Sequence, residues 1–295
     1  MDALEPELEK ILDFEQYGTL TPIAQDDGVN PLAKINYSKE YEQGMAYFRA
    51  LAAKQEYSIR AFNLTCFLIM HNPAHYTVWA YRFQVLNHIP ELIPQELAWL
   101  DSVIEDFQKN YQVWHHRQKL LGITKDYKHE LEFTKDMFAS DAKNYHVWSY
   151  RLWILQSFQD YTEELSLTSY LLEDDVYNNS AWNHRFYVLF ESNAKLERSL
   201  QDELDFLNDK LSKSPDNQSA WNYLSGILKK VGPNQLGGIA NQLEKQLPSS
   251  NRFLLEFLAE YDPTRSKVIY EKLANEVDTD NQLLWNWMIQ QVPRT

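Results

Sequence analysis

A nine-residue segment recurs in this chain at regular intervals, and it constrains the fold more than any other feature. Residues 109–117 and 143–151 share the frame Lys-Asn-Tyr-x-Val-Trp-x-x-Arg, and residues 178–185 keep its Asn-x-x-x-Trp-x-x-Arg part. The tryptophans of successive copies are 35, 34, 34 and 39 residues apart, at Trp79, Trp114, Trp148, Trp182 and Trp221. A period near 34 residues is the length of one helical hairpin, so the sequence predicts a helical-repeat protein.

The second helix of each hairpin is specified at its start and along one face. An asparagine stands four residues before the tryptophan and is suited to cap the helix N-terminus, at Asn110, Asn144, Asn178, Asn217 and Asn281. Trp, Arg three residues later and Leu seven residues later fall on one face, as in Trp114, Arg117 and Leu121. A guanidinium between two core residues must find acceptors. We therefore infer that each arginine reaches a carbonyl or carboxylate of a neighbouring repeat.

The first helix of each hairpin is marked by a Glu-Leu pair seventeen to eighteen residues before the tryptophan, at residues 96–97, 130–131, 164–165 and 203–204. Two degenerate hairpins near 234–260 and 263–291 bring the number to about seven. Only 8 glycines and 11 prolines occur in 295 residues, which favours long helices over many short strands. We expect an all-α fold, a right-handed α–α superhelix, or solenoid, forming a crescent.

The N-terminal segment differs from the repeats. Residues 1–20 begin with an acidic amphipathic piece, and residues 21–37 contain two prolines and a glycine, which disfavour a helix there. Ser38 is suited to cap a helix that extends to about residue 53. We expect an N-terminal arm at residues 1–37, partly extended and lying on another part of the molecule, followed by a helical-repeat domain at residues 38–295.

Charge and cysteine content limit the possible functions. The formal net charge of −14 argues against a nucleic-acid binder, which needs clustered cations. Cys66 is the single cysteine, so no disulfide forms within the chain. The N-terminus lacks a signal-peptide pattern, and no apolar run approaches the 18 or so residues of a membrane span. These features predict a cytoplasmic protein.

The repeat resembles that of a known family. Asn-x-x-x-Trp-x-x-Arg at the start of the second helix is similar to the protein prenyltransferase α-subunit repeat, whereas tetratricopeptide repeats place their tryptophan early in the first helix. The resemblance covers nearly the whole chain. It is strongest to the α subunit shared by farnesyltransferase and type I geranylgeranyltransferase, in residues 110–117, 141–148 and 219–224. The arm adds support through residues 22–31, Pro-Ile-x-Gln-Asp-Asp-Gly-x-Asn-Pro.

This resemblance implies a CaaX protein prenyltransferase that is active only as a heterodimer with a β subunit. In that family the β subunit, not the α subunit, holds zinc, and magnesium assists the farnesylating form. The cysteine thiolate of a CaaX-ending protein, such as a small GTPase, attacks C1 of farnesyl or geranylgeranyl diphosphate and forms a thioether. The α subunit supports the β subunit and stabilises the diphosphate leaving group.

The resemblance also implies roles for particular residues. Lys109, Tyr145 and His146 are expected to be catalytic at the diphosphate, while Tyr111 and Gln112 bind substrate. Their positions agree with anion binding, since free N–H groups at a helix N-terminus favour negative charge. Adjacent hairpins pack about 10 Å apart, so the two turns could converge on one diphosphate. We expect no metal ligands in this chain.

Other interpretations remain open at this point. The chain could be a Rab geranylgeranyltransferase α subunit, which needs an escort protein, or a non-enzymatic helical-repeat adaptor. Lys109 could simply complement a helix dipole. His115 and His116 point about 100° apart on a helix and cannot share a metal ion, so both are interpreted as structural. The tryptophans are expected to form the hairpin core.

Overall fold

The computed structural model describes residues 14–33, 35–194 and 198–292, and over these residues it is helical without any strand. This confirms the predicted all-α class. The α-helices are α2 Lys39–Ala53, α3 Ile59–His71, α4 Tyr76–His88, α5 Ile93–Asp106, α6 Tyr111–Thr124, α7 Tyr127–Ser140, α8 Tyr145–Phe158, α9 Glu164–Asp174, α10 Asn179–Phe186, α11 Leu200–Lys213, α12 Gln218–Val231, α13 Gly237–Gln246, α14 Arg252–Tyr261, α15 Ser266–Lys272 and α16 Gln282–Gln291. None of these helices is long and apolar enough to cross a membrane.

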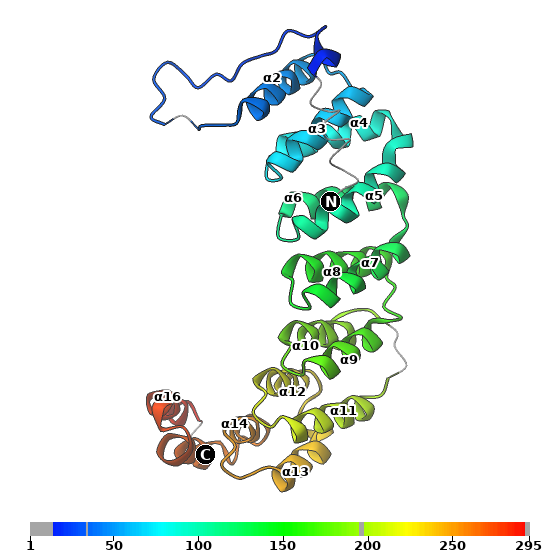
Figure 1. Ribbon diagram of the computed structural model, residues 1–295. Helices are drawn as coiled ribbons and strands as arrows, with labels where there is room; N and C mark the ends of the chain where they lie inside the picture. The colour runs from blue at the N-terminus through cyan, green and yellow to red at the C-terminus, as the bar shows by residue number, and fades with distance from the viewer. Residues whose placement is uncertain (1–13, 34, 195–197, 293–295) are drawn as a thin grey trace. The chain divides into compact units, whose positions relative to one another are not determined.

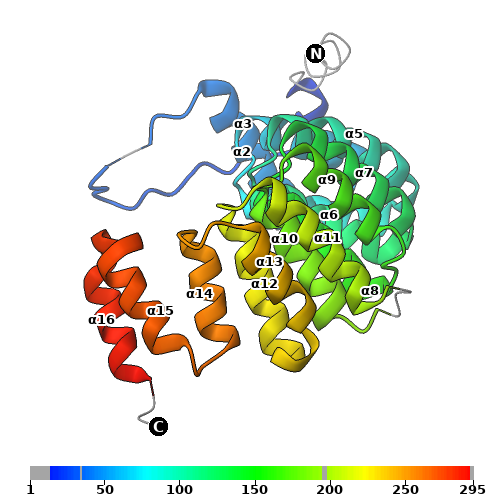
Figure 2. The ribbon, with the colours of Figure 1, turned by 90° about the horizontal axis from the view of Figure 1, so that it is seen from below.

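The chain divides into two compact units. Unit 1 contains residues 1–130 and 144–150, and unit 2 contains residues 131–143 and 151–295. In unit 1 the pair α3–α4 is followed by α5–α6, and in unit 2 α9–α10 is followed by α11–α12 and α13–α14 (Figure 1). Figure 2 shows the last pair, α15–α16, beside α14. With α7 and α8, seven helical pairs follow α2, as predicted.

The asparagine caps are confirmed in four of the five predicted places. The side-chain oxygens of Asn110, Asn144, Asn178 and Asn217 accept main-chain N–H groups of the helices that follow them. Asn281 was predicted to cap α16, and this is wrong. It lies in a 3-10 turn, Thr279–Asn281, without the extended backbone of a capping residue, and its side chain donates to Asp278 instead.

The amide nitrogens of Asn178 and Asn217, and of Asn251, which caps α14, bind the preceding repeat. In unit 2, Asn217 Nδ2 donates to the carbonyl of Val176 at 2.7 Å, and the indole of Trp182 donates to that same carbonyl at 2.8 Å. Equivalent bonds join Asn178 to Ala142 and Asn251 to Pro215. One side chain therefore caps its own helix and fastens the previous turn, so that the turns follow one another in a fixed register.

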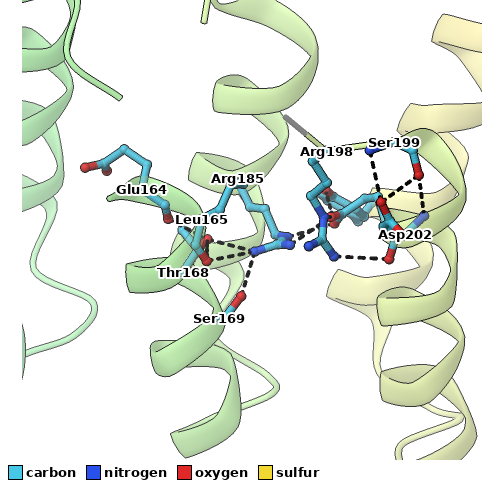
Figure 3. Close-up of polar contacts among 10 residues, drawn as sticks. Glu164, Leu165, Thr168, Ser169, Arg185, Arg198, Ser199 and Asp202 are labelled. Atoms are coloured by element: carbon cyan, nitrogen blue, oxygen red, sulfur yellow. Dashed lines mark hydrogen bonds and ion pairs between the residues drawn. The ribbon is translucent and has the colours of Figure 1, made fainter. Parts of the chain in front are cut away.

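The buried arginines contact the next helical pair, as the sequence analysis inferred. Arg185 of α10 donates to Glu203 of α11, with Nε and Nη2 each 2.7 Å from a carboxylate oxygen. Figure 3 shows the Arg185 side chain beside Leu165, Thr168 and Ser169 of α9. Its Nη1 donates to Thr168 and to the Leu165 carbonyl, both of α9. The same pairing recurs in Arg82–Glu96, Arg117–Glu130 and Arg151–Glu164. The Glu of each Glu-Leu pair is thus the buried carboxylate that the arginine of the preceding repeat requires.

A second donor completes each buried carboxylate, and it alternates between histidine and tyrosine. Glu96 and Glu164 contact His116 and His184 at 2.7 Å, while Glu130 and Glu203 accept from Tyr150 and Tyr223 at 2.6 and 2.7 Å. Burial raises the pKa of Glu96, but the charge of Arg82 and the bond to His116 outweigh it and lower that pKa to about 2.

The fifth repeat lacks this ion pair altogether. Leu224 takes the place of the arginine and is fully buried. The next helix, α13, begins Gly-Gly-Ile rather than with a Glu-Leu pair, and its Ile239 is buried. The chain therefore omits both charges together, as expected if an isolated buried charge is costly.

The arm is irregular between residues 21 and 33, as predicted. Its start lies on α2: the Ile23 N–H donates to the Ala46 carbonyl at 3.1 Å, and Arg49 donates back to the Ile23 carbonyl at 2.8 Å. Further along, Val29 and Leu32 are fully exposed, so this part does not lie on another described segment. The predicted amphipathic piece falls mainly on residues 1–13, outside the described residues. Ser38 caps α2 as predicted.

Candidate active site

The first part of the candidate site is the turn between α5 and α6. Lys109 lies exposed in this turn, followed by Asn110, whose side chain accepts from the Gln112 N–H at 2.8 Å and starts α6. Tyr111 is the first residue of α6 and is 67% exposed. The other N–H groups in the first turn of α6 have no acceptor within the helix, and such free N–H groups at a helix N-terminus favour an anion.

The second part is the start of α8, one repeat later. Asn144 accepts from the His146 N–H at 2.9 Å, Tyr145 is the first helical residue and 66% exposed, and His146 is half-buried. Asn144 Nδ2 also reaches the Gln108 side chain at 3.4 Å. The two turns therefore contact each other directly, both within unit 1.

The ring of His146 lies where the two turns meet. The rings of Tyr111 and His146 meet edge to face, with their centroids 4.4 Å apart. The rings of Tyr145 and His146 meet in the same way, with their centroids 5.5 Å apart. Burial lowers the pKa of His146, and the Lys109 carbonyl only partly offsets this. The structure thus brings together Tyr111, Tyr145 and His146, with the backbone of Lys109 beside them.

Two shallow hollows open beside these residues. The larger, of about 390 Å³, is lined by Tyr111, Gln112, Trp114, His115, Gln118, Tyr145, His146, Ser149 and Tyr150. The smaller, of about 190 Å³, is lined by Tyr76, Trp79, Ala80, Gln112, His115, His116 and Lys119. Gln112 and His115 border both hollows, and no carboxylate lines either of them. Uncharged and basic groups in this arrangement suit an anionic ligand.

Lys109 and Lys143 occupy the same place in the repeat, yet their surroundings differ. Lys143 forms an ion pair with Asp175, with Nζ 2.8 Å from the carboxylate. Within residues 14–33, 35–194 and 198–292, Lys109 has no carboxylate partner at ion-pair distance. Lys109 does not line the hollows, so only its backbone is placed against His146. Its ammonium group remains available to an external anion.

Some residues at the hollows were not predicted from the sequence. Tyr76 is the first residue of α4, 70% exposed, and holds the same repeat position as Tyr111 and Tyr145. A tyrosine three residues before three successive tryptophans was the signal that could have identified it. His115 was interpreted as structural, but it is exposed and borders both hollows, whereas His116 is buried against Glu96 as expected.

In the part of the chain that the structure describes, no group of three or more His, Cys, Asp or Glu side chains could hold a metal ion. The larger hollow offers two histidines and no carboxylate. Such a set fits neither zinc, which takes Cys, His and carboxylate ligands, nor magnesium, which needs carboxylate or phosphate oxygen.

Comparison with known proteins identifies the repeat. The model of the protein prenyltransferase alpha subunit repeat matches residues 59–89, 93–124, 127–158, 161–192 and 200–231. The chain belongs to this prenyltransferase family. The five matched repeats correspond to the helical pairs from α3–α4 to α11–α12, and α13–α16 lie outside the matched residues.

Relatives within the prenyltransferase family match over nearly the whole chain. The Schizosaccharomyces pombe protein farnesyltransferase/geranylgeranyltransferase type-1 subunit alpha is 66% identical, covering 98% of this chain and 99% of the relative. The Candida albicans protein of the same name is 34% identical, covering 92% and 96%. A solved structure of Candida albicans protein geranylgeranyltransferase-I complexed with GGPP covers 94% of this chain and 98% of its own, with 34% identity and a TM-score of 0.81. These findings confirm the family and the α–α superhelix class inferred from the sequence.

Proposed function

We propose that this chain is the α subunit of a heterodimeric CaaX protein prenyltransferase that joins a farnesyl or geranylgeranyl group to a C-terminal cysteine. The observation that carries the proposal is the 66% identity, over almost the full length of both chains, to a subunit of that name. The six similar curated proteins are all named protein farnesyltransferase/geranylgeranyltransferase type-1 subunit alpha. None of these six relatives supports the Rab-specific or the adaptor alternative.

The reaction requires stabilisation of a leaving group, and the candidate site is suited to it. The cysteine sulfur forms a bond to C1 of the prenyl diphosphate, the C1–O bond breaks, and diphosphate leaves with that electron pair. Donors aimed at the oxygen where charge accumulates accelerate such a step. Here the Lys109 ammonium and the hydroxyls of Tyr111 and Tyr145 would supply charge and hydrogen bonds. The N-terminus of α6 adds its main-chain N–H groups.

Gln112 is proposed to bind the carboxylate at the end of the peptide substrate. It is half-buried in the first turn of α6 and borders both hollows. Its side-chain amide has two donor hydrogens that can face a carboxylate. A peptide end placed in the smaller hollow would then lie beside Tyr76, with the reacting cysteine toward the larger hollow and His146.

The β subunit is proposed to cover the second helices of the repeats. From α5 to α12, each first helix carries at least three acidic residues, whereas α6, α8, α10 and α12 carry none; α4 also lacks them. The exposed side chains at the starts of α4, α6 and α8 are tyrosines. Interface cores are depleted in acidic residues and enriched in tyrosine. The charge of −14 is therefore carried largely by elements other than these second helices.

Zinc and magnesium are assigned to other parts of the enzyme. Because the residues at the hollows do not fit either ion, zinc is proposed to bind the β subunit, and magnesium, where used, the diphosphate oxygens. No step performed by this chain depends on a metal ligand of its own. A cytoplasmic location, with CaaX-ending small GTPases among the substrates, remains part of the proposal.

The test is prenyl transfer to a CaaX peptide, using this chain alone and then co-expressed with each candidate β subunit. Activity is expected only in the pair. Lys109→Ala should slow the single-turnover chemical step by up to about 10²-fold, because it removes one cationic donor to the leaving group. Lys143→Ala is the matched control and should change the rate less than about twofold, since its pair with Asp175 is on the surface. Equal rates for both variants would contradict the site assignment.

A further inference from the structure

The smaller hollow, between α4 and α6, contains a lysine whose charge is not used within the described chain. Lys119 lines this hollow together with Gln112 of α6 and Tyr76 of α4. Its side chain is half-buried, and its Nζ lies 5.1 Å from the centre of the Phe83 ring. Within the residues that the structure describes, no carboxylate lies at ion-pair distance from Lys119.

The surroundings of Lys119 explain why it has no such partner. The helices α4, α6 and α8 contain no acidic residue. Glu96, which lies behind His116, is buried and already pairs with Arg82 and His116. A partly buried charge without a counter-ion is unfavourable. We therefore expect an anion from outside the chain to enter this hollow.

Lys119 is the residue that gives the smaller hollow a permanent positive charge. His116 also lines it, but burial lowers the pKa of His116, although its bond to Glu96 opposes this shift. Lysine stays protonated throughout the neutral pH range. Gln112 offers two N–H donors and no charge. A carboxylate in the hollow would therefore find hydrogen bonds at Gln112 and a counter-charge at Lys119.

Gln112 and Lys119 lie where one ligand can contact both. Seven residues separate them, which is nearly two helical turns, so both lie on the same face of α6 and about 10 Å apart along its axis. Both border the same hollow. Because long helical side chains lean toward the N-terminus of their helix, the lysine stem shortens its distance to Gln112.

We propose that Lys119 determines the preference of the enzyme for a peptide with a free C-terminal carboxylate, by pairing its ammonium group with the carboxylate that Gln112 orients. This inference rests on the proposed function, in which the peptide end enters the smaller hollow. Exclusion of water when the hollow is covered strengthens the charge pair. A peptide that ends in a neutral amide lacks this interaction. Lys119 takes no part in the bonds made and broken at the cysteine, so it acts on peptide binding and not on the chemical step.

The experiment measures prenyl transfer by the heterodimer to two CaaX peptides that differ only in a C-terminal carboxylate or amide. Lys119→Met keeps an unbranched stem beside Phe83 and removes the charge. It is expected to lower kcat/KM for the acid peptide about tenfold, through a higher KM, because a charge-assisted bond is lost. The value for the amide peptide should change less than about twofold. Lys119→Arg keeps the charge and should restore most of the preference for the acid peptide.

A matched control removes the same charge elsewhere. Lys128 of α7 is exposed and lines neither hollow, so Lys128→Met should leave kcat/KM for both peptides within about twofold of the wild type. It separates a local effect at Lys119 from the effect of a more negative net charge.

The outcomes that contradict the proposal differ from those that contradict the proposed function. An active Lys119→Met pair with an unchanged ratio of acid to amide kcat/KM would overturn the role of Lys119. Equal losses for the two peptides would also overturn it, because Lys119 would then support packing or contact the β subunit. A wild-type pair without any transfer activity would refute the proposed function itself, and this inference with it.

Discussion

Replacing Arg117 with leucine should destabilise the chain by about 3–5 kcal/mol, because the buried carboxylate of Glu130 would lose its cation. Arg117 Nε and Nη2 donate to the two oxygens of Glu130 at 2.6 and 3.0 Å, and both side chains are almost fully buried. Each charge-assisted bond contributes about 1.5–3 kcal/mol, so losing two accounts for this range. The hydroxyl of Tyr150 would remain, but it carries no compensating charge.

The double variant Arg117→Leu/Glu130→Leu should be more stable than Arg117→Leu alone by about 2 kcal/mol, since it removes both charges. The chain already uses this solution where Leu224 and Ile239 are buried without an ion pair. Urea unfolding of the full-length chain, followed by far-UV circular dichroism, measures each free energy of unfolding. Asp101→Asn is the control, since the exposed Asp101 carboxylate should contribute less than about 1 kcal/mol to the Arg117 pair. A double variant whose loss equals the sum of the single losses would refute the argument.

Three further changes test the packing. The free energy of unfolding of the wild type should fall by about 3 kcal/mol as pH decreases from about 4.5 to 2. The folded state depresses the pKa of Glu96 to about 2, so the Glu96 carboxylate contributes its full stability only above its pKa in the unfolded chain. Glu96→Gln should flatten this acid part of the stability–pH curve, and an unchanged curve would contradict the assignment. Asn217→Ala should lower the free energy of unfolding by about 1–3 kcal/mol, because it removes a helix cap and a bond to the preceding turn. Asn281→Ala removes neither, so in thermal unfolding it should change stability by less than about 0.5 kcal/mol. Equal losses in the two variants would contradict the double role of Asn217. Gly226→Ala should lower the free energy of unfolding by about 1–3 kcal/mol, because the new Cβ would lie 2.8 Å from a ring carbon of Phe186. Gly122→Ala, whose Cβ would meet nothing within 4 Å, should raise it by about 0.5–1 kcal/mol. A stabilising Gly226→Ala would show that the Phe186 ring can move aside.

Much of the fold could be predicted from the repeat period, because successive hairpins repeat the same local sequence signals. The caps at Asn110 and Asn178 depend only on residues two or three positions away, and both were predicted correctly. Asn281 shares the spacing but not the backbone conformation, which depends on the preceding 3-10 turn and cannot be seen in the spacing. The arginine partners were predicted as a class of acceptor, whereas their identity as Glu96 and its equivalents depends on how consecutive pairs stack.

The candidate site was predicted through family resemblance more than through physical pattern. Lys109 and Lys143 are followed by the same Asn-Tyr-x-Val-Trp sequence, and only the structure shows that Lys143 is paired with Asp175. The roles of Tyr111 and Gln112 in substrate binding stay predictions. His115 was set aside because two adjacent histidines cannot share a metal ion, an argument that says nothing about which of them faces solvent.

The asparagine that fastens one turn to the next also decides where this chain can change length. Asn110, Asn144, Asn178 and Asn217 each stand four residues before a tryptophan, and one added residue there would break the cap and the contact with the previous turn together. The buried arginine and its glutamate lie on either side of the turn at the opposite end of the hairpins. They are separated by 14, 13, 13 and 18 residues in the four successive pairs, and the ion pair forms in all four. Insertions, deletions and engineered loops should therefore be tolerated at the Arg-to-Glu ends, while the ends that carry Lys109 and His146 should keep an invariant length.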